Sequence, residues 1–257
     1  FLALEKAAVV TWDVILDTSR EGGGDSAMAR DTRQAIEAGT GIVVAGSTSH
    51  AAVDTRPGAE DPTQPLTHIE GDPRGIHGAA YGLLPFPELR AAGWWGGVDA
   101  PRGPDGIIRE IPLILRVGEK YYPTLALQTL LVYLQVPAAK VRVKLGEAVL
   151  FPAKDRIWRI PIDRRGWFLL NYRYDQPAGR PDFPTHSYLE LLLKINESRM
   201  ERKPGAPKPP DLAGKIVFVG QTVTGKADAG PTPRGAFSPL VLVHANLLNN
   251  LLTDDYA

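Results

Sequence analysis

Short apolar runs and longer segments with one apolar face alternate along the first part of the chain. Val9–Leu16 is apolar and rich in β-branched residues, which predicts a buried strand. A helix is predicted over Ser26–Ala38, because Asp25 can cap its first turn and Gly39 can end it. Gly41–Ala45 predicts a second strand. A strand, a helix and a strand in succession favour a sheet that is at least partly parallel.

The middle of the chain predicts a loop, a hairpin and a buried helix. Asp54–Arg74 is rich in proline, glycine and acid, so we expect a long surface loop. Trp94–Val98 and Ile107–Leu115 flank the turn sequence PRGPDG, which predicts a hairpin with a longer loop. Thr124–Val136 is predicted to be a mostly buried helix. Short strands are expected at Val141–Val143, Val149–Phe151, Trp158–Pro161 and Trp167–Leu170.

A helix, a polar connection and a strand are predicted next. Ser187 can cap a helix over Tyr188–Ile195. Residues 196–210 are polar and rich in proline, and they predict an irregular connection. Lys215–Val219 is an apolar run of the kind found in central strands, and we expect it to be the last strand of the chain.

The last predicted element is a helix over Leu240–Leu252, with Ser238 as its N-cap and Pro239 in its first turn. This uncharged tract and Tyr121–Ala139 are both interrupted by polar residues, so they favour buried helices over membrane spans. The predicted fold class is therefore α/β, with a mixed, partly parallel sheet and flanking helices in a single domain.

Composition and charge exclude several kinds of site. The 257 residues include 29 basic and 29 acidic side chains and no cysteine. This balance gives no electrostatic reason to expect nucleic acid as a partner. Without cysteine there are no disulfides, thiolate nucleophiles or cysteine zinc sites. The five histidines lack metal-ligand spacing and no serine lies in a nucleophile motif, so we expect no catalytic residue, metal or cofactor.

Two features resemble catalytic motifs only in part. Gly220–Lys226 fits the phosphate-loop pattern GxxxxGK, but Ala227 stands where a hydroxyl would ligate Mg²⁺. The prolines of residues 229–233 are incompatible with the helix that should follow such a loop. We favour a surface loop, with a soluble nucleotide-binding enzyme as the alternative. Asp13 and Asp17 share a face of the first predicted strand, and the sequence indicates no third partner for them.

Several motifs of the second half follow one another in a recognisable order. They are PDGIIREIPLIL at 104–115, Leu125-Ala-Leu127, Leu170-Asn171-Tyr172, and finally Gly220, Asp228, Thr232-Pro233 and His244-Ala-Asn246 with Leu251-Leu252. In this order they resemble the CHASE type-two domain, an extracellular sensor of bacterial cyclases, histidine kinases and Ser/Thr kinases. The resemblance covers most of the chain after Trp94. A glycine of the family pattern is Leu240 here, and the family's first strand and membrane helix have no match in the chain.

The resemblance implies that residues 1–257 are an extracytoplasmic sensory domain, periplasmic or extracellular, of a membrane-bound receptor. The domain would respond to a small molecule or an environmental stimulus and would not itself be catalytic. Transmembrane helices outside this chain would tether it, and a cytoplasmic adenylate or guanylate cyclase or a kinase would be regulated by it. The receptor is expected to be a homodimer with no nucleic-acid partner. A structural or dimerisation module without a ligand is the other alternative.

The candidate ligand-binding residues are Arg109, Asn171, Asp228, Thr232, Arg234 and His244. We expect a ligand beyond the end of strand Lys215–Val219, between the loop over residues 220–237 and the start of the last helix. Open α/β sheets bind ligands beyond the carboxyl ends of their strands, which is the reason for this location.

Arg109 and His244 also have interpretations that involve no ligand. On a strand, Arg109 would lie on an apolar face, so an ion pair with Asp105 or Asp228 is favoured over ligand binding. Asp105 with the glycine after it is typical of a turn. Helical periodicity places His244 toward the core, which favours a hydrogen-bonded core histidine, with a pH-responsive switch as the sharper hypothesis. The asparagines at 246, 249 and 250 are expected on the opposite side of that helix.

Overall fold

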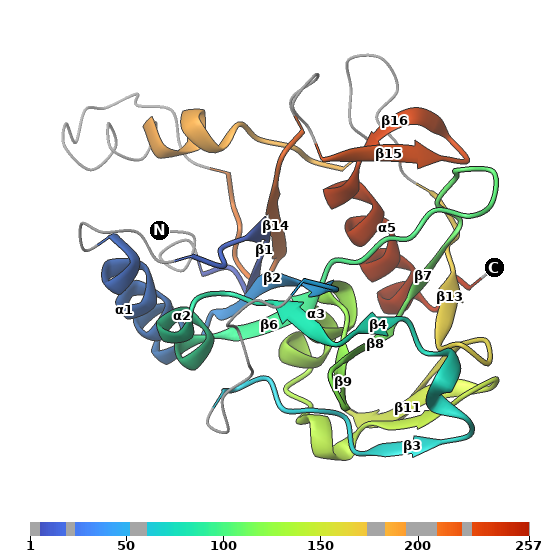
Figure 1. Ribbon diagram of the computed structural model, residues 1–257. Helices are drawn as coiled ribbons and strands as arrows, with labels where there is room; N and C mark the ends of the chain where they lie inside the picture. Colours follow the sequence, from blue (N-terminus) through green and yellow to red (C-terminus); the bar gives the residue numbers. More distant parts are fainter. Residues whose placement is uncertain are drawn as a thin grey trace.

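A partly parallel sheet lies at the centre of the computed structural model (Figure 1), which describes residues 6–18, 24–51, 61–173, 183–193, 210–222 and 228–256. The sheet contains β14 (Ile216–Gly220), β1 (Val9–Ile15), β2 (Gly41–Ser49) and β5 (Tyr81–Leu83) in that order, and β6 (Trp94–Gly97) also pairs with β2. β1 is parallel to β14 and β2, β2 is parallel to β6, and β5 is antiparallel to β2. The predicted α/β class and partly parallel sheet are confirmed.

Helices cover both faces of the sheet (Figure 1). One face packs on α1 (Gly24–Glu37) and α2 (Pro87–Ala92), and the other packs on α3 (Leu125–Tyr133), which α5 (Leu240–Thr253) adjoins. Side chains alternate along a strand, and this alternation divides the two faces. Val10 belongs to the cluster with α1 and α2, whereas Val9 packs with Leu125 of α3. On the same face as Val9, the hydroxyl of Thr11 is hydrogen-bonded to that of Thr129 at 2.9 Å.

The remaining strands form smaller sheets beside this core. One sheet contains β3 (His68–Glu70), β10 (Arg142–Lys144), β11 (Ala148–Ala153) and β12 (Arg156–Pro161), and a second contains β4 (Gly78–Ala79), β8 (Ile114–Val117) and β9 (Lys120–Pro123). Two more sheets have two strands each: β7 (Glu110–Pro112) with β13 (Trp167–Leu169), and the hairpin of β15 (Ala229–Thr232) with β16 (Gly235–Pro239). Short 3-10 helices lie at Pro73–Gly75 and Ala138–Lys140. The largest apolar cluster packs many of these strands against α3 and α5.

Most predicted elements lie where the sequence indicated. The two strands on either side of α1 and the buried helix α3 are confirmed, as are the four short strands between residues 141 and 170. α1 begins at Gly24, so Asp25 lies in its first turn instead of preceding it, and Gly39 (φ 92°) follows its end as expected. Residues 188–193 are helical, with the backbone N–H of Glu190 donating to Ser187 Oγ at 3.4 Å. Residues 194–209, which include most of the predicted polar connection, lie outside the described residues.

The predicted hairpin of Trp94–Val98 and Ile107–Leu115 is wrong. β6 is a parallel neighbour of β2, and β7 pairs with β13 from much later in the chain. The PRGPDG sequence does form a turn, at Gly106 (φ 81°), but the strands on either side of it find other partners. Pairing in this region is decided by apolar burial across the whole domain, which a local turn signal does not report.

The predicted surface loop over Asp54–Arg74 is only partly correct. Residues 52–60 lie outside the described structure, but His68–Glu70 form strand β3 next to β10. Asp61 is buried and makes an ion pair with the buried Arg90 of α2, at 3.3 Å between Oδ2 and Nε. A loop that is rich in acid and proline therefore returns to the core through one buried charge pair.

The predicted position of the strand at Lys215–Val219 is also wrong. β14 lies at the edge of the sheet instead of its centre, and two further strands, β15 and β16, come after it. The bounds of the last helix are confirmed to within one residue. Its N-cap is Pro239, which has no side-chain acceptor, and the hydroxyl of Ser238 is instead hydrogen-bonded to that of Thr232 at 2.9 Å. Among the described helices none has the length and apolar character that a membrane span requires.

The contact between β6 and α3 allows no side chain at Gly96. A Cβ atom there would lie 2.7 Å from Cα of Leu125 and 2.9 Å from its backbone nitrogen. We expect Gly96→Ala to lower the free energy of unfolding by about 1–3 kcal/mol, because the backbone of α3 would have to move. Gly24→Ala is the control, since a Cβ at Gly24 meets nothing within 4 Å. Urea unfolding measures both, and equal midpoints for the two variants would contradict the expectation.

Candidate functional site

The carboxyl edge of the central sheet meets the first turn of α5. Asp13, near the end of β1, is in register with Gly220 at the end of β14. Gly220 lies directly against α5, because a Cβ atom on it would be 2.6 Å from Cβ of Val241. The backbone N–H of Leu240, the first residue of α5, donates to the carbonyl of Asp228 at 2.8 Å. Asp13, Asp228 and the start of α5 are thus brought together, and we call this place the edge site.

His244 completes the edge site. It lies three residues after Val241 and therefore on the same side of α5, toward the sheet. Its side chain is 1% exposed, which confirms that it faces the core. The expected hydrogen bond is missing for one ring nitrogen, because Nδ1 is buried and finds no partner within the described structure. Leaving such an atom unsatisfied costs about 1–3 kcal/mol, so the position calls for an explanation beyond packing.

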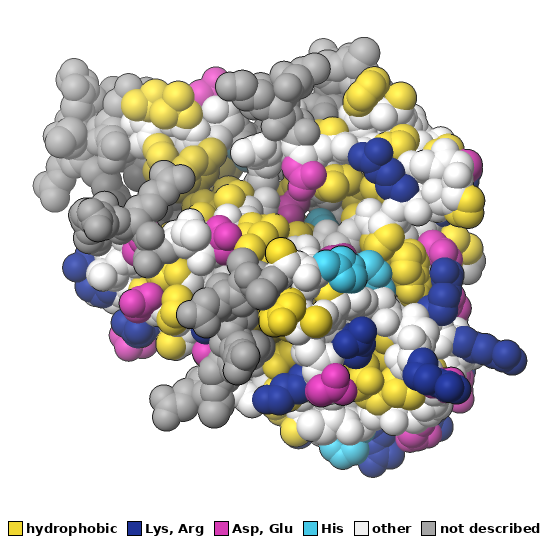
Figure 2. Space-filling model, in the orientation of Figure 1, with side chains coloured by type: hydrophobic (Ala, Val, Ile, Leu, Met, Phe, Trp, Pro, Cys, Tyr) yellow, Lys and Arg dark blue, Asp and Glu magenta, His cyan; other side chains and the backbone are white. Residues whose placement is uncertain are grey.

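The electrostatics of the edge site centre on Asp13. Burial raises the pKa of its carboxyl group, the neighbouring His244 lowers that pKa, and the carboxylate of Asp228 raises it. Figure 2 shows acidic side chains, with a histidine behind them, in the recessed region between β14 and α5. Among the described residues, no three histidine, aspartate or glutamate side chains come together in a way that could hold a metal ion.

The phosphate-loop alternative finds little support in this place. Residues 223–227, including Lys226, lie outside the described residues. Ala229–Thr232 form strand β15, as the prolines indicated, and not the helix whose N-terminus would face a phosphate. The glycine at the end of β14 is instead explained by its close contact with α5.

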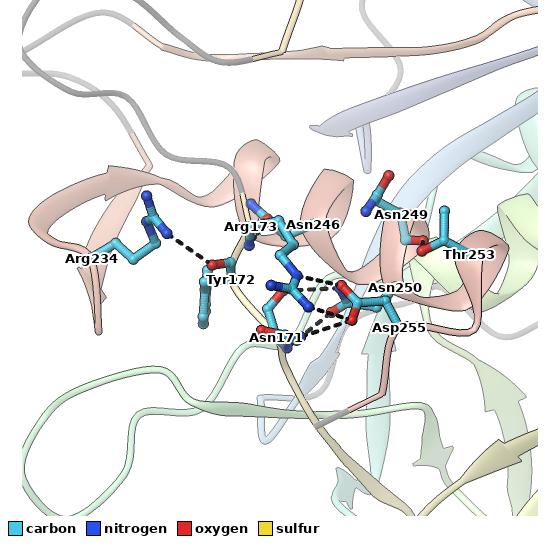
Figure 3. Close-up of polar contacts among 9 residues, drawn as sticks. All are labelled: Asn171, Tyr172, Arg173, Arg234, Asn246, Asn249, Asn250, Thr253 and Asp255. Carbon is cyan, nitrogen blue, oxygen red and sulfur yellow. Dashed lines mark hydrogen bonds and ion pairs between the residues drawn. The ribbon is translucent and has the colours of Figure 1, made fainter.

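A second polar site lies along α5 and involves Asn171 (Figure 3). Its backbone N–H donates to Oδ1 of Asn250 at 3.0 Å, and Nδ2 of Asn250 donates to the Asn171 carbonyl at 2.9 Å. One turn earlier in α5, Oδ1 of Asn246 accepts from the backbone N–H of Arg173 at 3.2 Å. Two helix side chains therefore take the place of a neighbouring strand for the segment over residues 171–173.

The same segment is fixed to the end of the chain by charge. Arg173 donates to both oxygens of Asp255, at 2.6 and 2.8 Å, and Nδ2 of Asn171 donates to the same carboxylate at 2.9 Å (Figure 3). The hydrogen bonds from Arg173 lower the pKa of Asp255. Asp254, next to it, forms an ion pair with Arg156 of β12. We call this set of contacts the C-terminal clamp.

Predictions about the asparagines of α5 were wrong for two of the three. Asn246 and Asn250 are 1% and 0% exposed, although the helical pattern placed them opposite the core. α5 is packed on several sides, and its polar face meets the main chain of residues 171–173 instead of solvent. Asn249 is the one that is partly exposed.

Arg109 has the role expected for it without a ligand. It pairs with Asp105 at 2.6 Å, and both side chains are about half exposed. Oδ1 of Asp105 also accepts from the backbone N–H of Ile107, which is the expected turn chemistry. β7 begins at Glu110, so Arg109 precedes the strand face on which it was predicted.

Thr232 and Arg234 belong to the hairpin above α5. The Thr232 side chain is buried against Ser238, and the backbone N–H of Arg234 donates to its hydroxyl at 3.3 Å. Nη1 of Arg234 donates to the carbonyl of Tyr172 at 3.2 Å (Figure 3). Of the six predicted residues, the structure brings Asp228 and His244 to the edge site and Asn171 to the C-terminal clamp. Arg234 lies beside the clamp, Thr232 is buried in the hairpin, and Arg109 lies in a turn.

Sequence reasoning missed the role of Asp13 and a cluster around Asp99. The carboxylate of Asp99, just after β6, accepts from the backbone N–H and the hydroxyl of Thr48 at 3.0 and 2.6 Å, and lies 3.3 Å from Nε2 of His77. Burial raises the pKa of Asp99, but the hydrogen bonds from His77 and Thr48 outweigh it and lower the pKa overall. These groups satisfy one another, which indicates a structural role. For Asp99 the available signal was an acid directly after an apolar run, and for Asp13 it was an acid within an apolar strand.

Asn250 tests the bonds that hold the segment over residues 171–173. We expect Asn250→Ala to lower the free energy of unfolding by about 2–4 kcal/mol, because two hydrogen bonds are lost and the backbone groups of Asn171 lose their partners. Asn249→Ala is the matched control, since this side chain is partly exposed, and it should change stability by less than about 0.5 kcal/mol. Urea unfolding compares the two, and similar losses would show that these hydrogen bonds contribute little.

A substitution of Asp13 tests how much the ionised carboxylate at the edge site lowers the free energy of unfolding. A folded-state pKa above the unfolded one means that stability is highest below the unfolded pKa, near 3.9, and falls as pH rises through the folded pKa. We therefore expect Asp13→Asn to be more stable than the wild type at pH 7, with the difference vanishing near pH 3. Thermal unfolding over this pH range measures it.

The control for that titration is Asp72→Asn. Hydrogen bonds from Arg74 lower the pKa of Asp72 to about 2. The ionised carboxylate of Asp72 therefore stabilises the folded state, whereas that of Asp13 destabilises it. This substitution should not raise stability at pH 7. A loss of stability in Asp13→Asn at neutral pH would contradict the assigned cost of the carboxylate.

Comparison with known proteins agrees with the order of motifs. A family model described as CHASE2 domain matches residues 1–257, the entire chain. No significant match was found among curated proteins or among solved structures. Domains of this family are extracellular, generally non-catalytic sensors. The chain therefore belongs to the CHASE2 family, the sensory domains of signalling receptors.

Proposed function

We propose that this domain is the extracytoplasmic input of a membrane-tethered, homodimeric receptor, and that it regulates a cytoplasmic nucleotide cyclase or kinase. A small molecule would bind at the edge site and shift the first turn of α5, and the helix would transmit this shift to the C-terminal clamp. The family assignment supports a sensory role, and the arrangement of α5 supports the route.

The observation that carries the proposal is that one helix belongs to both polar sites. The first turns of α5 contain Val241 and His244, which line the edge site. Its last turns contain Asn250, and the C-terminal clamp closes on Asp255 just beyond. A helix is stiff over this length, so a ligand that shifts its first turn also shifts its last.

The two alternatives have less support. A nucleotide-binding enzyme would need a helix after the loop at 220–226, and strand β15 is there instead. A purely structural module would have no use for an unsatisfied ring nitrogen at His244, because an apolar side chain would fill the same space at lower cost. A ligand bound at the start of α5 would give that nitrogen a hydrogen-bond partner.

The experiment uses the full-length receptor in membrane vesicles. Its coding sequence should place apolar segments of about 20 residues beside this domain and a catalytic domain beyond them. We expect Arg173→Ala to change the basal rate of nucleotide or phosphoprotein formation several-fold, because it breaks the C-terminal clamp.

The matched control is Arg159→Ala, which breaks an exposed ion pair with Glu147 that includes no residue of the C-terminal clamp, and it should leave the basal rate unchanged. Equal rates for the wild type and for Arg173→Ala would argue against transmission through α5. A full-length protein without a membrane span or effector would remove the receptor proposal altogether.

A further inference from the structure

We propose that the edge site binds a small organic cation through a primary ammonium group. The inference rests on the proposed sensory function and adds to it the chemical class of the stimulus. The ligand would lie between the end of β1 and the first turns of α5, with Asp13 and His244 as its partners and Asp228 at the rim.

The side chains that face this place are two carboxylates and one histidine. β1 contributes Asp13, the residue before β15 contributes Asp228, and α5 contributes His244, while β14 contributes only Gly220. Among the described residues, the charges that act on Asp13 are those of His244 and Asp228. Two carboxylates therefore meet without an arginine or lysine between them in the described part of the site, and a cation would compensate for this.

Two described arginines lie at the same hairpin: Arg234, whose Nη1 donates to the carbonyl of Tyr172, and Arg102, which reaches the hairpin from the exposed side. Its Nη2 donates to the carbonyl of Ala229 at 3.4 Å, and its side chain is exposed. This contact is with the backbone beside Asp228 and involves no carboxylate of the edge site. The negative charge of Asp13 thus remains available to a ligand.

Hydrogen-bonding capacity selects an ammonium group. An ammonium has three N–H donors and no acceptor. The carboxylate of Asp13 and the unpartnered Nδ1 of His244 are acceptors, provided that the imidazole carries its proton on Nε2. A primary amine in its charged form can donate to both, and the carboxylate of Asp228 at the rim adds to the attraction by its charge. This would satisfy the buried nitrogen, which finds no partner among the described residues.

Two other ligand classes fit less well. A metal ion needs at least three converging ligands, and the described residues offer no such group of histidine, aspartate and glutamate. An anion would be attracted by the N-terminus of α5, which is equivalent to about half a positive charge. Two carboxylates outweigh that half charge, so the sign of the site favours a cation.

Calorimetry on the purified chain tests the proposal with butylamine and 1,4-diaminobutane as probes. We expect both amines to bind to the wild type, whereas butanol, of the same length without charge, should not. Tetramethylammonium, which has the charge but no N–H donor, should bind at least about tenfold more weakly than butylamine. The comparison separates hydrogen bonding from simple charge attraction.

Three variants locate the site. Asp13→Asn should weaken amine binding at least about tenfold, because it removes the charge and keeps the shape. His244→Gln should also weaken binding, since the geometry of its acceptor changes. Asp72→Asn removes an exposed carboxylate in another part of the fold and should bind the amines as the wild type does. Should His244→Gln fail to fold, Asp13→Asn, which is expected to gain stability, still decides the question.

The proposal is overturned if the amines fail to bind, if butanol binds as well as butylamine, or if Asp13→Asn keeps the wild-type affinity. Its failure can be told from failure of the receptor proposal. Amine binding that Asp13→Asn abolishes, with an effector rate that Arg173→Ala leaves unchanged, would keep the ligand class and remove the route through α5. If the amines fail to bind but Arg173→Ala changes the effector rate, the route through α5 is kept and the ligand class is removed.

Discussion

A helix buried on several sides must find a partner inside the protein for every polar side chain it carries, and α5 is such a helix. Asn246 and Asn250 meet this requirement by bonding to the main chain of residues 171–173. His244 does not meet it at Nδ1, which has no partner in the described structure. The two asparagines therefore have a structural role, and the unsatisfied nitrogen of His244 is the position at which we propose that a ligand binds.

The two parts of the fold meet along this helix. The α/β part ends at the first turn of α5, through Gly220 and Val241, and the small sheets reach its last turns through Arg156 of β12 and Asp254. The hairpin of β15 and β16 leads into the start of α5 and reaches the segment over residues 171–173 through Arg234. Movement of α5 would therefore be felt in both parts, which is the geometry that an input domain needs.

How much the sequence predicted depended on whether the signal was local. Apolar periodicity located the elements of the central sheet and the last helix, because burial follows directly from it. The prediction of a hairpin between Trp94–Val98 and Ile107–Leu115 was wrong, since the partners of β6 and β7 come from distant parts of the chain. At the edge site, His244 was predicted, but Asp13 was not, because only the pairing of β1 with β14 brings it there. Asn250 was misplaced because periodicity cannot distinguish a solvated polar face from one that bonds to main chain.

Asp13 shows why such a site would be kept although it lowers stability. Burial and the charge of Asp228 oppose ionisation of its carboxyl group, and His244 only partly compensates. An amide at this position would be better tolerated by the fold, and an apolar residue in place of His244 would leave no unsatisfied nitrogen. Natural proteins retain strained or poorly solvated groups where binding needs them. The same desolvation that disfavours a carboxylate in the empty site would strengthen its attraction to a bound cation, since both effects come from the low dielectric around it.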